Sequence, residues 1–157
     1  MTKIKKLKYV EQLDPSGCTI ACLAMIVDKK YFELRDFLND KKQQVINCLL
    51  KENVYFPHFY KDHTSSRIHF YGQEIMNILE TIFQIKSRFI EFRSMENLVN
   101  HCVLTVSDIK GCKICSSHAV LYDARKKIIL DPSSHFGSRL NNNLVGHNVV
   151  TCLEILG

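Results

Sequence analysis

Three residues of this 157-residue chain stand in settings that suit nucleophilic chemistry, and the first is Cys18. It begins a run of small and apolar residues, typical of a buried helix, directly after Gly17. A thiol at a helix N-terminus has a lowered pKa, because the free backbone N–H groups and the helix dipole favour the thiolate. Gly17 would allow a tight turn and leave the sulfur open to solvent. The pattern predicts Cys18 as a nucleophile.

A thiolate nucleophile needs a base, and the base needs an acceptor on its second ring nitrogen to fix its tautomer. His118 opens one apolar stretch, and a second apolar stretch ends in Asp131. A hairpin that turns at residues 123–126 would bring positions 118 and 131 to the same end of a sheet. We therefore predict His118 as the base and Asp131 as the residue that orients it.

The elements that must position these residues change from helical to strand periodicity along the chain. Helices are predicted over residues 18–27, 31–38, 41–51 and 73–83, and strands over 88–92, 102–106, 119–122, 127–130 and 148–155. Residues 1–17 form an approach segment that ends in a turn, and residues 55–71 are predicted to be irregular. Helices followed by antiparallel strands predict an α+β fold, as one domain over residues 1–157.

Composition and charge are those of an ordinary globular domain, with 46% hydrophobic and 24% charged residues. The net charge of +5 comes from scattered lysines without an aromatic-interleaved basic stripe. We expect a solvated surface and no nucleic-acid partner; an acidic partner or a nucleic-acid backbone is the alternative.

Export signals and membrane spans are not predicted, since the N-terminus carries no apolar run of about 7 to 15 residues that leads to a cleavage site, and no segment approaches the roughly 18 apolar residues of a span. We expect a cytoplasmic protein, in its own cell or in one to which it is delivered. Seven cysteines, an odd number, then indicate reduced thiols.

Cys112 and Cys115 form the one competing arrangement, because two cysteines separated by two residues can supply half of a zinc site or a redox dithiol. No matching pair of cysteines or histidines with ordered spacing stands out. We expect a reduced structural loop, no metal and no cofactor. His135 and the aromatic residues of segment 55–71 are candidates for lining a cleft.

The segments around these residues resemble a known family. Gln12, a turn-forming stretch and the run from Gly17 to Ile26 are similar to the active-site helix of C39 peptidases, the bacteriocin-processing cysteine peptidases of the papain-like clan, and of their stand-alone relatives. The segments that begin at His118 and end at Asp131-Pro132 are similar to the second and third motifs of the family. The resemblance covers residues 12–132.

The resemblance implies a papain-like fold, with the nucleophile helix packed on a C-terminal antiparallel sheet, and a bacterial thiol protease that needs no cofactor. Gln12 would donate its side-chain amide, with the backbone N–H of Cys18, to the oxyanion of a peptide or protein substrate. Family members usually carry an acidic or amide residue before the cysteine and a glycine after it, whereas this chain has Gly17 and Thr19. Thr19 would narrow the cleft.

Other functions share this apparatus. A deamidase or an acyl transferase forms the same thioester, and only the acceptor and the pocket differ. A C39-like module that has lost catalysis and binds a peptide is another alternative, although all four matching residues are in place. A chance resemblance of an α+β domain is the third. The sequence sets neither the substrate nor the oligomeric state.

Overall fold

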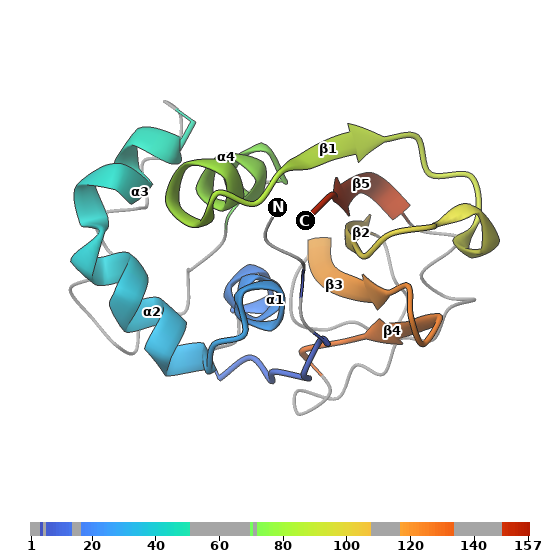
Figure 1. Ribbon diagram of the computed structural model, residues 1–157, viewed down its shortest axis with the longest axis horizontal. Coiled ribbons are helices and arrows are strands. Elements are labelled where there is room, and N and C mark those ends of the chain that lie inside the picture. The colour runs from blue at the N-terminus through green and yellow to red at the C-terminus, as the bar shows by residue number, and fades with distance from the viewer. Residues whose placement is uncertain are drawn as a thin grey trace.

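The helices come first along the chain and the strands follow (Figure 1). The structure, a computed structural model, describes residues 4, 6–13, 17–50, 70, 72–107, 117–133 and 149–157. Within these residues the helices are α1 (Cys18–Val27), α2 (Tyr31–Asp40), α3 (Lys42–Cys48), α4 (Gly72–Phe83) and a short 3-10 turn, η2 (Met95–Asn97). The strands are β1 (Ser87–Ile90), β2 (Cys102–Ser107), β3 (Ser117–Asp123), β4 (Ile128–Leu130) and β5 (Val149–Ile155). The α+β prediction is confirmed.

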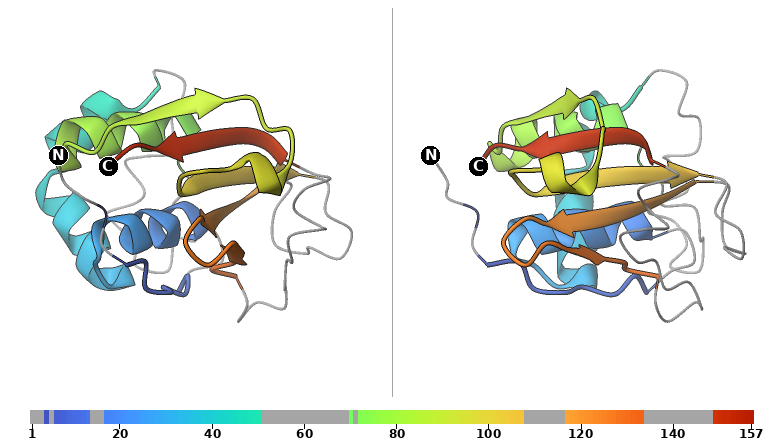
Figure 2. Two further views of the ribbon diagram at one scale, coloured as in Figure 1. Left: turned by 45° about the vertical axis from the view of Figure 1, so that its right-hand side comes forward. Right: turned by 90° about the vertical axis from the view of Figure 1, so that its right-hand side faces the viewer.

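The five strands form one sheet in the order β1-β5-β2-β3-β4, and every neighbouring pair is antiparallel. The last strand therefore lies inside the sheet, between β1 and β2. Leu104 of β2 marks the centre, opposite both Val120 of β3 and Cys152 of β5. Helix α1 packs against β3, and the views of Figure 2 show it lying along that strand.

Alternation along the strands divides the apolar side chains between the two faces of the sheet. On the helical face, Val103, Ala119 and Leu121 join the core formed with α1, α2 and α4. The opposite face carries a second cluster, made of Met95, Leu98, Cys102, Leu104, Val106, Val120, Tyr122 and Cys152.

Helix α1 is buried along almost its whole length, from Cys18 to Ile26. It has no polar face, because it contacts α2, α4 and β3 on different sides. Burial of each large side chain contributes about 1.5–3 kcal/mol, so this helix holds the helical layer onto the sheet. It ends at Asp28, whose left-handed conformation (φ 56°) closes the helix and whose carboxylate lies 3.0 Å from the Lys8 ammonium.

Element ends differ slightly from the predicted ones. α2 continues to Asp40, and α3 stops at Cys48 because Leu49 takes an extended conformation. β1 begins at Ser87, since that residue already pairs with Ile155 of β5. In the part of the chain that the structure describes, all five cysteines are buried and none is in a disulfide, as expected of reduced cysteines.

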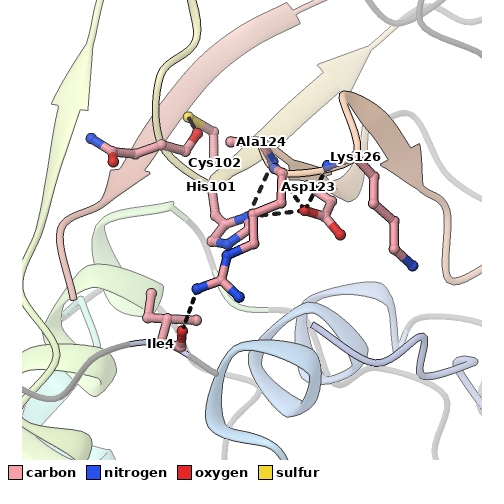
Figure 3. Close-up of polar contacts among 8 residues, drawn as sticks. Ile4, His101, Cys102, Asp123, Ala124 and Lys126 are labelled. Carbon is pink, nitrogen blue, oxygen red and sulfur yellow. Dashed lines mark hydrogen bonds and ion pairs between the residues drawn. The ribbon is translucent and has the colours of Figure 1, made fainter. Parts of the chain in front are cut away.

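A network at the β3–β4 turn fastens the N-terminal segment to the sheet (Figure 3). The Asp123 carboxylate accepts hydrogen bonds from the backbone N–H groups of Arg125 and Lys126. The Arg125 guanidinium donates to the Ile4 carbonyl at 3.1 Å. The turn thus holds a segment far from it in sequence.

His101 closes the same network, and its protonation is expected to destabilise the protein. Its Nδ1 accepts the Ala124 N–H at 3.1 Å and lies 3.5 Å from Asp123 Oδ1. Burial lowers its pKa from 6.5, Asp123 opposes this effect and Arg125 adds to it. The folded protein then binds fewer protons than the unfolded chain between the two pKa values, so stability is present above about pH 6.5 and is lost as the pH falls.

Urea unfolding at about pH 7.5 and about pH 5.5 measures this contribution. His101→Asn keeps an acceptor at the δ position but does not titrate, and it is expected to reduce the loss of unfolding free energy on acidification. An equal loss in both proteins would contradict the assignment.

Candidate active site

The structure brings His118 and Asp131 into direct contact. His118 Nε2 lies 2.7 Å from Asp131 Oδ1, and both residues are less than a tenth exposed. Burial raises the pKa of the Asp131 carboxyl, but hydrogen bonds from His118 and Ser133, together with the charge of His118, outweigh it and hold that pKa below its usual value. Asp131 is therefore a carboxylate at neutral pH, placed to accept the Nε2 proton of the imidazole.

The hairpin that brings them together has a different register from the predicted one. The turn was predicted at residues 123–126, which would set Asp131 directly opposite His118. Instead Asp123 pairs with Ile128, and Lys127 takes a left-handed conformation (φ 56°) inside the turn. Relative to the predicted pairing, each strand is thus offset by one residue, so the register changes by two residues in all. Continuing this register sets Asp131 diagonally from His118, at a distance that the histidine side chain can span.

Ser133 occupies the place opposite His118 in the continued register, and sequence reasoning missed it. It is fully buried, with its hydroxyl oxygen 2.7 Å from Asp131 Oδ1 and 3.0 Å from His118 Nε2. Its backbone N–H also donates to Asp131 Oδ1, at 2.9 Å. Counting the register from the correct turn is the signal that would have found it.

Cys18 is the first residue of α1, as predicted, but the prediction that its sulfur is open to solvent is wrong. The residue is 2% exposed. The reason is the central position of α1, whose first turn is already enclosed by neighbouring elements. His118 belongs to β3, the strand against which α1 packs.

Gly17 serves close packing before Cys18, and the turn at this position does not require the conformational freedom of glycine. Its backbone angles, φ −87° and ψ 14°, are accessible to other residues. A Cβ at this position would instead overlap the Tyr31 hydroxyl and lie 2.8 Å from Tyr31 Cζ. The Tyr31 side chain thus packs against the start of the helix.

Asp131 lies within electrostatic reach of the first turns of α1. The pKa of the Cys22 thiol is raised, chiefly by complete burial and further by the charges of Cys18 and Asp131. Cys22 therefore remains a thiol and packs in the core, as predicted. The influence of the Asp131 charge on Cys22 links the hairpin end to the helix that carries Cys18.

Gln12 lies beside the end of the hairpin. Its backbone N–H donates to the Pro132 carbonyl at 2.9 Å, and its side chain is buried. Three residues earlier, the Tyr9 hydroxyl donates to the Asp131 carbonyl at 3.0 Å. Two hydrogen bonds thus align the N-terminal segment with residues 131–132, so that Gln12 and Asp131 are positioned together.

Thr19 is buried, and its hydroxyl oxygen accepts the Phe70 N–H at 3.2 Å. This bond ties α1 to the residue two positions before α4 begins. The hydroxyl is thereby engaged with the backbone, whereas the resemblance to C39 peptidases predicted that Thr19 narrows the cleft.

Several sequence hypotheses lie outside the described residues: those on Cys112, Cys115, His135 and the aromatic residues of segment 55–71 other than Phe70. Within the described ranges, no group of three or more His, Cys, Asp or Glu side chains is arranged to hold a metal ion. Nor does that part of the chain contain a helix with the length and apolar character to cross a bilayer.

Comparison with known proteins does not place the chain in a family. No family model matches it, and no curated protein sequence gives a match. The geometry of the site is therefore the basis on which a function is argued.

Proposed function

We propose that this protein is a papain-like, C39-like cysteine peptidase, in which Cys18 is the nucleophile, His118 the base and Asp131 the residue that orients the base. One observation carries the proposal, the 2.7 Å contact between His118 Nε2 and Asp131 Oδ1 in a buried setting. A buried carboxylate held against an imidazole is the arrangement that fixes a catalytic histidine.

The contact assigns the tautomer of His118. With Asp131 ionised, Nε2 must carry the proton, because a lone pair at 2.7 Å from a carboxylate oxygen would be repelled. Nδ1 is then the basic nitrogen of the ring. A base of this kind takes the thiol proton of Cys18 and leaves a thiolate paired with an imidazolium.

The reaction follows from these roles. The Cys18 thiolate attacks the peptide carbonyl carbon. The oxyanion that forms accepts hydrogen bonds from the Gln12 side-chain amide and from the Cys18 backbone N–H. The C–N bond then breaks as the His118 imidazolium protonates the leaving amine, which gives a thioester. Water attacks this thioester while His118 accepts its proton, and the carboxylic acid leaves as the thiol is restored.

Further support for the fold assignment comes from α1, which begins at Cys18 and packs on β3 within an antiparallel sheet. That order and packing are what the C39 resemblance implies. The backbone hydrogen bond from the Gln12 N–H to the Pro132 carbonyl supports the role of Gln12 as an oxyanion donor, since it fixes this residue next to Asp131.

The rate of iodoacetamide alkylation at Cys18 against pH, read site by site by mass spectrometry, tests the proposal. We expect Cys18 to react well below the ordinary thiol pKa of about 8.5. Cys22 and Cys48 are internal references, because burial raises the pKa of both thiols. His118→Ala should remove the reactivity of Cys18 at low pH.

His101→Asn is the matched control, since His101 is also a buried histidine beside an aspartate. It is expected to leave the pH dependence of Cys18 unchanged. If Cys18 reacts no faster than Cys22 and Cys48, or if His118→Ala has no more effect than His101→Asn, the proposed function is wrong.

A further inference from the structure

Three donors converge on a single oxygen at the end of the hairpin. Asp131 Oδ1 lies 2.7 Å from His118 Nε2, 2.7 Å from Ser133 Oγ and 2.9 Å from the Ser133 N–H. Ser133 Oγ is also 3.0 Å from His118 Nε2, so the three side chains form a closed triangle. All three are buried.

The local turn explains only part of this arrangement. An aspartate side chain commonly accepts the backbone N–H two residues onward, and the bond from the Ser133 N–H to Asp131 is of that kind. Such a turn does not require a hydroxyl at the following position. The two contacts of Ser133 Oγ are therefore a separate feature of this chain.

Proton positions in the triangle follow from its distances. Asp131 has no proton to give, so the Ser133 hydroxyl donates to Oδ1 and turns an oxygen lone pair toward His118 Nε2. The Nε2 proton of His118 then faces two acceptors, Asp131 Oδ1 and Ser133 Oγ. The opposite tautomer of His118 would place its Nε2 lone pair against the Asp131 carboxylate.

The same pattern suits both protonation states of the imidazole. His118 keeps its Nε2 proton whether Nδ1 is bare or protonated, so neither Ser133 nor Asp131 needs to rotate when Nδ1 gains a proton. Groups that stay in place during a proton transfer add no reorganisation free energy to that step.

We propose that Ser133 is a positioning residue of the active site, which holds the Asp131 carboxylate and the Nε2–H tautomer of His118 through its hydroxyl. This inference rests on the proposed function. Ser133 acts through its two neighbours and takes no part in bond making. Loss of its hydroxyl removes one donor from the carboxylate and one acceptor from Nε2, which makes protonation of Asp131 easier.

The test is the rate of iodoacetamide alkylation at Cys18 against pH in the wild type, Ser133→Ala and Ser133→Thr. Because a hydrogen bond to a charged group typically changes an equilibrium by about tenfold or more, Ser133→Ala should react about tenfold more slowly near pH 6. On acidification, Cys18 of this variant should lose its reactivity at a higher pH than Cys18 of the wild type. Ser133→Thr keeps the hydroxyl. It should preserve the acid limb of the wild-type profile, which is the range in which Cys18 reactivity falls as the pH falls.

Ser87→Ala is the matched control, since the Ser87 hydroxyl is also buried and lies on β1, at the far edge of the sheet from β4. It should leave the Cys18 profile unchanged. An unshifted acid limb in Ser133→Ala overturns the inference, and so does failure of this variant to fold, because the serine would then serve the fold. If wild-type Cys18 shows no dependence on His118, the proposed function itself fails, which separates the two outcomes.

Discussion

Replacement of Asp131 by alanine is expected to slow Cys18 alkylation near pH 6 by about a hundredfold or more, whereas asparagine, which keeps an acceptor oxygen, should slow it less. Alanine removes an acceptor that His118 and Ser133 share, and both of these polar groups remain buried. Asparagine can present its amide oxygen at the Oδ1 position to the same three donors. It therefore keeps the His118 tautomer and loses only the negative charge that stabilises the imidazolium.

Asp123→Ala is the matched control for this series. Asp123 is a buried aspartate beside a histidine, His101, at the other end of the hairpin. Its loss removes the acceptor of two backbone N–H groups in the turn and is expected to lower stability, as measured by urea unfolding. The pH dependence of Cys18 alkylation should stay as in the wild type. Equal effects of Asp123→Ala and Asp131→Ala on Cys18 would show that the assignment of Asp131 is wrong.

Local patterns predicted the elements of the fold well. The run from Cys18 to Val27 gave the bounds of α1, because a helix that is apolar on every side has no alternative to a central position. The short apolar runs of β2 and β3 likewise gave strands whose ends lie within two residues of those observed. Both signals depend on neighbours in sequence, which a single chain displays directly.

Features that depend on contacts between distant segments were missed. Nothing in the turn sequence signals that Lys127 takes a left-handed conformation, yet the observed hairpin register differs from the predicted one, and only its continuation past Leu130 sets Ser133 opposite His118. The burial of Cys18 likewise follows from packing around α1. Gly17 was explained by backbone freedom, because the side chain that requires it, Tyr31, comes from the following helix.

Gly17→Ala is expected to lower the free energy of unfolding by about 2–3 kcal/mol, the cost typical of overpacking a filled core. The added methyl group would overlap the Tyr31 hydroxyl and lie 3.1 Å from Tyr31 Cε2. Relief requires a shift of the tyrosine or of the first turn of α1, so alkylation of Cys18 should slow as well. Urea unfolding measures the first effect and site-resolved mass spectrometry the second.

Gly72→Ala is the matched glycine control, because the atoms nearest to a Cβ there belong to the Phe89 ring, at 3.1 Å and beyond, and to the Thr151 side chain. Its effect on stability should be smaller than that of Gly17→Ala.

Tyr31→Phe removes the overlapping oxygen but keeps Cζ, at 2.8 Å from the Cβ position. In a double-mutant cycle it should therefore restore part of the stability lost in Gly17→Ala. Additive losses would contradict the proposed overlap. A coupled pair would show that a larger side chain directly before Cys18 requires a smaller side chain at position 31.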